Sequence, residues 1–139
     1  MRELGERTLA RVQALQLLFQ AHALGEGLID LLAEERYTLE SAPLLEYADE
    51  LARGVVAHTD DIDDRIADAA ANWTIARMPS VDRELLRLAV YEMVYVEDVP
   101  VSVTINEAVE IAKRYGTDES SKFVNGVLGR IADDIESEA

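Results

Sequence analysis

The sequence predicts an all-α protein, a bundle of six to seven helices arranged as two sub-bundles within one domain that spans residues 1–139. Apolar residues recur at helical spacing along the whole chain, and no stretch of useful length alternates as a β-strand does. The length of 139 residues suits one domain, and a hydrophobic content of 49% is enough for a core. Because the chain has no cysteine, disulfide bonds and thiolate metal sites are excluded.

The first helix is predicted over residues 4–24, with its end at Gly25. Apolar residues cover two of its faces, which is typical of a helix at the centre of a bundle. Between these faces Gln13, Gln16 and Gln20 form a stripe along the helix. We interpret this stripe as a polar seam rather than as a surface that reads RNA.

The middle of the chain predicts three shorter helices, near residues 28–36, 43–57 and 60–72. Pro79 and Ser80 then open another helix. Its body, "LLRLAVYEMVYV", is apolar nearly all round, so we expect it to be the buried centre of the second sub-bundle.

The next helix carries local start and stop signals. Thr104 and Glu107 fit a capping box, in which each side chain binds a backbone N–H at the start of a helix. Gly116 supplies the stop. We expect Thr117 or Asp118 to cap the last helix.

The last helix contains the stretch "SSKFVNGVLGRI", which runs from Ser120 to Ile131. On a helical wheel Lys122, Gly126 and Gly129 lie opposite the apolar stripe, and Phe123 lies on its flank. Each glycine inside a helix costs about 1 kcal/mol relative to alanine, which is easiest to explain if something approaches the backbone closely.

These residues suit a single-stranded nucleic acid, since an aromatic ring can stack on a base and a lysine can neutralise a phosphate. Spacing alone favours the alternative. In that alternative Phe123 covers the edge of the core, Lys122 is merely solvated, and the glycines let another helix pack.

The formal charge of −15 opposes non-specific binding of nucleic acids, because phosphate groups are repelled. Residues 26–71 are the most acidic part, with 13 acidic side chains against three arginines. An RNA site must therefore be a local basic patch outside residues 26–71.

No motif for catalysis, a cofactor or a metal stands out, and we predict that the protein is not an enzyme. His22 and His58 are isolated, and the acidic run from Asp60 to Asp64 lacks the glycine and distal glutamate of a calcium loop. The N-terminal residues mix charges into the apolar run, so they predict neither a signal peptide nor a membrane span. A cytoplasmic protein without a membrane partner is the expectation.

Four stretches together resemble the NusB family of bacterial antitermination factors. They are "RTLARVQALQLLFQA", "SVDRELLRLAVYEM", "DVPVSVTINEA" and "TINEAVEIAKRYGTDESSKFVNGVL". The resemblance covers nearly the whole chain and is weakest over residues 25–75. It implies binding of boxA-type single-stranded RNA together with NusE, the ribosomal small-subunit protein. It further implies entry into RNA polymerase elongation complexes with other Nus factors during ribosomal RNA transcription, and it leaves a homodimer open.

The resemblance also implies roles for particular residues. The arginine-rich arm of the family falls on Arg7 and Arg11, with Arg2 further out, and a basic residue of the central helix falls on Arg87. The surface that faces NusE falls on Phe19 and Asp82. The RNA-contacting start of the last helix falls on Glu119, Lys122, Phe123 and Asn125.

The arm departs from the family pattern, because Thr8 and Leu9 interrupt it and Glu3 and Glu6 oppose its charge. We therefore expect weak RNA binding by this chain alone, with the basic surface of the partner adding affinity.

Several alternatives stay open. Arg87 could form an ion pair inside the bundle, and Glu92, on the apolar side of the same helix, should have a buried partner. Trp73, Tyr91 and Tyr95 are most simply aromatics of the core or its edge. The whole protein could be an adaptor with little RNA affinity, or a recognition domain related to RNA cytosine methyltransferases.

Overall fold

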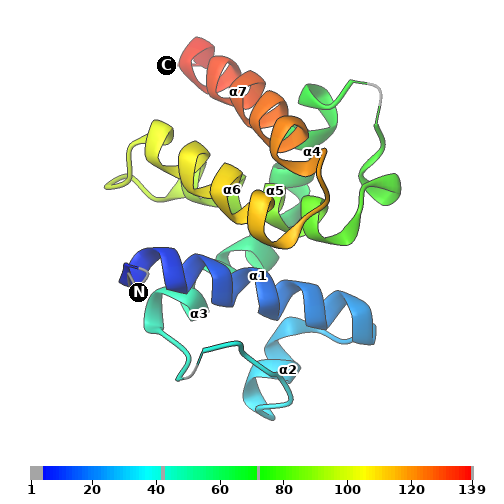
Figure 1. The fold of residues 1–139 in the computed structure, drawn as a ribbon, viewed down its shortest axis with the longest axis vertical. Helices are drawn as coiled ribbons and strands as arrows, with labels where there is room; N and C mark the ends of the chain where they lie inside the picture. Colours follow the sequence, from blue (N-terminus) through cyan, green and yellow to red (C-terminus); the bar gives the residue numbers. More distant parts are fainter. Residues whose placement is uncertain (1–4, 42, 72, 139) are drawn as a thin grey trace. The chain divides into compact units, whose positions relative to one another are not determined.

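The computed structural model describes residues 5–41, 43–71 and 73–138. These residues form seven α-helices and one short 3₁₀ helix, with no strand among them (Figure 1). The prediction of an all-α fold with six to seven helices is confirmed. The helices are α1 (Glu6–Leu24), α2 (Leu28–Ala33), α3 (Glu46–Ala57), α4 (Thr59–Ala69), η1 (Ile75–Arg77), α5 (Ser80–Tyr95), α6 (Val101–Tyr115) and α7 (Ser120–Glu138).

The chain divides into two compact units, which agrees with the two predicted sub-bundles. The first unit ends at Ala57 and contains α1 to α3, and the second begins at His58 and contains α4 to α7.

In the first unit α1 packs against α2 and α3. The end of α1 follows prediction, because Gly25 adopts a left-handed conformation with φ of 66°. The core of this unit comes from buried alanine and leucine side chains of α1, from Leu28, Leu31 and Leu32 of α2, and from one face of α3.

The glutamine stripe of α1 holds the extended segment between α2 and α3. The Gln13 amide donates to the carbonyls of Ser41 and Pro43 at 2.8 and 2.9 Å and accepts from the Leu45 N–H at 2.9 Å. Gln16 accepts from the Glu40 N–H of the same segment, and Gln20 accepts from the Thr38 N–H and donates to the Thr38 carbonyl. A segment without its own secondary structure thus satisfies its backbone groups on side chains, and the polar-seam interpretation is confirmed.

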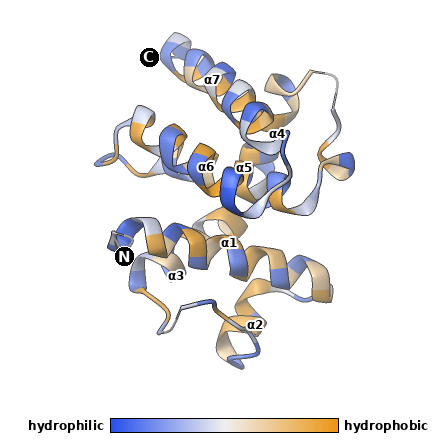
Figure 2. Ribbon diagram, viewed as in Figure 1, coloured by the Kyte–Doolittle hydropathy of each residue, from blue (hydrophilic) through white to orange (hydrophobic). Residues whose placement is uncertain are grey.

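In the second unit α5 contacts α4, α6 and α7, and it is buried nearly all round, as its sequence predicts. The expected buried partner of Glu92 is present, since the hydroxyl of Thr104 in α6 donates to the Glu92 carboxylate at 2.6 Å. Helices α6 and α7 are amphipathic, and hydrophobic and hydrophilic stretches alternate along both (Figure 2).

The predicted capping box at Thr104 is wrong. Helix α6 already begins at Val101, with Pro100 as its N-cap residue, so Thr104 lies one turn inside the helix. Its hydroxyl is committed to Glu92 of α5 and does not cap the helix. No described helix is long and apolar enough to cross a membrane.

Candidate nucleic-acid interface

The start of α7 borders a pocket of about 480 Å³ in the second unit. Its lining comes from the segment before η1, the start of α5, the turn between α6 and α7, and the first turn of α7. The lining residues are Trp73, Pro79, Asp82, Thr117, Glu119, Lys122 and Phe123. The structure therefore brings together four residues that the sequence assigns to RNA or partner binding, namely Asp82, Glu119, Lys122 and Phe123.

Two aromatic rings form one wall of this pocket. Phe123 and Trp73 meet edge to face, with ring centroids 6.1 Å apart and planes at 67°. Trp73 is 53% exposed, and Phe123 is half-buried. The sequence predicts Trp73 as an aromatic of the core or its edge, and it leaves Phe123 open between RNA stacking and the edge of the core; the structure places the two rings together in the lining of the pocket.

A chain of hydrogen bonds through Ser120 links Asp82 and Thr117, two residues that line the pocket. The hydroxyl of Ser120, which is 1% exposed, donates to Asp82 at 2.6 Å and accepts from the Thr117 N–H at 2.9 Å. The Thr117 hydroxyl lies 3.2 Å from the Ser120 oxygen. Since the only proton of Ser120 goes to Asp82, the Thr117 hydroxyl is the donor in this last bond. The start of α7 is thereby tied to α5.

Gly116 makes this turn sterically feasible. A Cβ atom at this position would lie 2.5 Å from the Ser120 Oγ and 2.8 Å from the Ala112 carbonyl oxygen. The glycine is therefore needed for close packing, while its φ of −94° would suit any residue.

The outer face of α7 is open. Lys122, Asn125 and Gly126 are exposed, and no hydrogen bond or ion pair of the Lys122 side chain occurs within the described part of the chain. A Cβ atom at Gly126 or Gly129 would meet nothing within 4 Å. Hence no described helix packs on these glycines, so the packing of another helix within this chain does not explain them.

The arm residues at the start of α1 differ in exposure. Arg7 is exposed, and its guanidinium lies 4.5 Å from the centroid of the Tyr47 ring. Arg11 is only 5% exposed, so its side chain is largely withdrawn from solvent. Arg2 lies outside the described residues.

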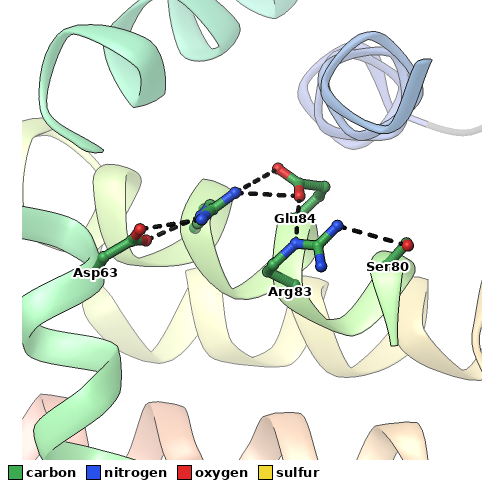
Figure 3. Close-up of polar contacts among 5 residues, drawn as sticks. Asp63, Ser80, Arg83 and Glu84 are labelled. Carbon is green, nitrogen blue, oxygen red and sulfur yellow. Dashed lines mark hydrogen bonds and ion pairs between the residues drawn. The ribbon is translucent and has the colours of Figure 1, made fainter. Parts of the chain in front are cut away.

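Arg87 forms the ion pairs that the alternative interpretation expects. It donates to Asp63 of α4 at 2.9 and 3.0 Å and to Glu84, one turn earlier on α5, at 3.2 Å. Glu84 also accepts a hydrogen bond from the Nε of Arg83. The Nη2 of Arg83 lies 3.5 Å from the Ser80 hydroxyl oxygen (Figure 3). Burial alone would lower the pKa of Arg87, but the bonds to Asp63 and the charge of Glu84 outweigh it and raise that pKa.

Part of the acidic run of α4 is also held by hydrogen bonds within the fold. Asp61 accepts from the Tyr95 hydroxyl at 2.6 Å and from Arg65 at 3.2 Å. The Tyr95 bond, more than the charge of Arg65, lowers the pKa of Asp61 below its ordinary value. His58 stacks on the Tyr95 ring with centroids 4.0 Å apart. Among the described residues no group of three or more His, Asp or Glu side chains could hold a metal ion.

The two residues assigned to the partner surface also differ. Phe19 is 39% exposed on α1, in the same unit as the exposed Leu24 and Ile29. Asp82 is 4% exposed and accepts a hydrogen bond from Ser120, so it is held in the lining of the pocket.

Sequence reasoning missed Ser120, Thr117 and the part played by Trp73. Ser120 and Thr117 look like ordinary residues of a helix start, and the bond from Ser120 to Asp82 spans 38 positions in the chain. Trp73 lies in a segment without periodicity, where only its large apolar side chain was a signal.

Comparisons with known proteins bear directly on this arrangement. The chain matches the model of the NusB family over residues 8–133. The transcription antitermination protein NusB of Bacillus subtilis (strain 168) is 46% identical over 135 residues, which cover 94% of this chain and 98% of that protein. The solved structure of T. maritima NusB is 39% identical, with a TM-score of 0.80 and coverage of 99% of this chain and 100% of that one.

A further similar structure contains the antitermination factors NusB and NusE in complex with dsRNA. Its matching chain is 30% identical, with a TM-score of 0.78, and the match covers 92% of this chain and 96% of that one. The names of these relatives are those of transcription factors and not of enzymes. With a family model matched over most of its length and a curated relative 46% identical, the chain belongs to the NusB family.

Proposed function

We propose that this protein binds boxA-type single-stranded RNA together with NusE and joins RNA polymerase elongation complexes, with other Nus factors, during ribosomal RNA transcription in the cytoplasm. The observation that carries the proposal is the start of α7, where the exposed Lys122 stands beside the Trp73–Phe123 pair at the rim of an apolar pocket. The similar structure that holds NusB, NusE and dsRNA supports RNA and NusE as partners.

The chemistry of this surface suits an unpaired strand. Bases that are not stacked in a duplex can lie on aromatic rings, and such stacking contributes roughly 1–3 kcal/mol per base. Lys122 supplies a cation for the phosphate next to the stacked base. The bare backbone at Gly126 lets a strand come close to the helix without meeting a side chain.

The charge of the chain limits how much RNA it can hold by itself. Against a formal charge of −15, Lys122 and Arg7 offer only local attraction, and Arg11 and Arg87 are withdrawn or paired. We expect NusE to supply the remaining affinity through its own surface. RNA binding should therefore be weak for the chain alone, stronger with NusE, and lower at high salt.

The test is fluorescence anisotropy with a labelled boxA-type RNA, at two salt concentrations, with and without purified NusE. The chain contains two lysines, so Lys113 on α6 is a matched control for Lys122. We expect Lys122→Glu and Phe123→Ala to weaken binding by roughly tenfold, the effect of one lost phosphate or stacking contact. Lys113→Glu, which changes the net charge equally, should have a much smaller effect.

If neither substitution at the start of α7 changes RNA affinity while both variants remain folded, the proposed RNA site is wrong. Circular dichroism of each variant checks the fold independently.

A second candidate function is a protein adaptor with little RNA affinity. The exposed apolar side chains of Phe19, Leu24 and Ile29 favour it, since such groups bind protein surfaces. Calorimetry with NusE, followed by RNA titration of the complex, separates the two functions. A tight complex that gains no affinity for boxA RNA would support the adaptor, and Phe19→Ala should then weaken the complex.

A further inference from the structure

We propose that the pocket beside Trp73 and Phe123 takes up a single nucleobase that carries an exocyclic amino group, namely adenine, cytosine or guanine in preference to uracil. This inference rests on the proposed function, because it names the chemical class that the RNA site selects. The pocket is about 480 Å³, within the range of roughly 300–1,000 Å³ that is typical of small-ligand sites.

The lining of the pocket favours a base over a phosphate. Its walls are mostly apolar, and of its charged side chains two, Asp82 and Glu119, are acidic. A phosphate inside the pocket would face both carboxylates, whereas a flat aromatic base would lie against the Trp73 or Phe123 ring. Lys122 is then available for the phosphate of the same nucleotide.

The same lining disfavours a basic side chain of a partner protein. Aromatic rings and carboxylates can together hold an arginine or lysine. Lys122 is itself part of the lining, however, and its ammonium would repel a second cation. A neutral base meets no such repulsion.

Hydrogen-bonding capacity selects the kind of base. The carboxylates of Glu119 and Asp82 are acceptors only. The Thr117 hydroxyl is already committed as a donor to Ser120. The edge of adenine, cytosine or guanine presents an amino group as a donor, whereas the single N3–H donor of uracil is flanked by two carbonyl oxygens that a carboxylate repels. The pocket should therefore distinguish amino from carbonyl edges.

The pocket is also held in place before any ligand binds. Ser120 joins Asp82 of α5 to Thr117 of the preceding turn, and the first turn of α7 carries Glu119, Lys122 and Phe123. A preformed site loses less free energy in ordering its side chains when a ligand binds.

The experiment uses the only tryptophan of the chain as its reporter. A base stacked at the pocket quenches the emission of Trp73. We would titrate the protein, with and without NusE, with a hexamer of uridine and with matched hexamers in which one central uridine is replaced by cytidine or adenosine. Comparison with a Trp73→Phe variant isolates the Trp73 signal when NusE is present, and label anisotropy measures total RNA binding in parallel.

We expect the hexamers with one amino-bearing base to bind at least about fivefold more tightly than the uridine hexamer, because hydrogen bonds to charged acceptors are among the stronger ones. Quenching of Trp73 should follow the same binding curve. Glu119→Gln should bring the ratio between amino-bearing and uridine hexamers close to one, since an amide can donate as well as accept. Glu110→Gln, an exposed position on α6, is the matched control and should keep the ratio.

The outcomes separate this inference from the proposed function. RNA binding with no preference among the hexamers, or without quenching of Trp73, overturns the base pocket and leaves RNA binding in place. Quenching by N-acetyl-arginine amide but not by RNA overturns it in favour of a basic side chain of a partner. Absence of any RNA binding, even with NusE, overturns the proposed function itself.

Discussion

The three glycines around α7 should respond in opposite ways to the same substitution. Gly126 and Gly129 lie in the interior of the helix, and a Cβ atom at either would meet nothing within 4 Å. Gly116 lies in the turn before the helix, and a Cβ atom there would lie 2.5 Å from the Ser120 Oγ. We therefore predict that Gly126→Ala and Gly129→Ala stabilise the protein and that Gly116→Ala destabilises it.

The magnitudes follow from the local geometry. Alanine is favoured over glycine by about 0.5–1 kcal/mol at an unstrained helical position, chiefly because the unfolded chain loses conformational freedom. The double variant at Gly126 and Gly129 should therefore gain about 1–2 kcal/mol. At Gly116 the added methyl group must push away Ser120 or the backbone of Ala112, which we expect to cost roughly 1–3 kcal/mol.

Urea unfolding followed by far-ultraviolet circular dichroism gives the free energies of unfolding of the wild type and the three single variants. Loss of stability in Gly126→Ala or Gly129→Ala, comparable to that in Gly116→Ala, would refute the open outer face of α7. The same proteins tested for RNA binding show whether the bare backbone serves a ligand, since stabilised variants with weaker RNA affinity place the strand on this face.

Three further predictions concern the packing that supports the site. Gln13→Leu should lower the free energy of unfolding by about 2–4 kcal/mol, because three backbone groups of the segment between α2 and α3 lose their partner; urea unfolding measures this loss. Thr104→Val should cost about 1–3 kcal/mol, because the buried Glu92 carboxylate loses a donor, and an unchanged unfolding midpoint would contradict that role. Tyr95→Phe should be less stable than the wild type between the ordinary pKa values of Asp61, 3.8, and of Tyr95, 10.0. The bond between them lowers the pKa of Asp61 and raises that of Tyr95, so its contribution disappears as the pH falls through the lowered value or rises through the raised one. Unfolding curves across the pH range should therefore converge at both ends.

Helical periodicity was sufficient to predict the fold. The apolar stripes of α6 and α7 and the all-round apolar surface of α5 each follow from spacing that the sequence displays directly. The polar stripe of α1 was equally visible, although the segment that it binds, residues 38–45, carries no periodicity and could not be placed in advance.

Local sequence patterns could not predict the interactions between distant parts of the chain. Thr104 matches a capping box by its neighbours, yet its hydroxyl binds Glu92, which is 12 residues earlier on another helix. Arg7 and Arg11 share a helix face by spacing, but only packing decides that Arg7 is exposed and Arg11 buried.

The candidate site was predicted only in part, because it also depends on contacts between distant parts of the chain. The helical wheel of α7 correctly predicts that Lys122 faces solvent and that Phe123 lies on the flank of the apolar stripe. It cannot show that Trp73, fifty positions earlier, meets Phe123, because the two residues come from segments far apart in the chain. The inward position of Asp82 likewise depends on Ser120 of α7.

The central claim is that Lys122 contacts an RNA phosphate at the start of α7, and the salt dependence of affinity tests it most directly. The logarithm of the association constant for boxA-type RNA, measured with NusE present, is plotted against the logarithm of salt concentration for the wild type, Lys122→Gln and Lys113→Gln. We predict that the slope becomes shallower by about 0.7 in Lys122→Gln, the value for one phosphate contact on a single strand, and stays unchanged in Lys113→Gln. Equal slopes for all three proteins would contradict it.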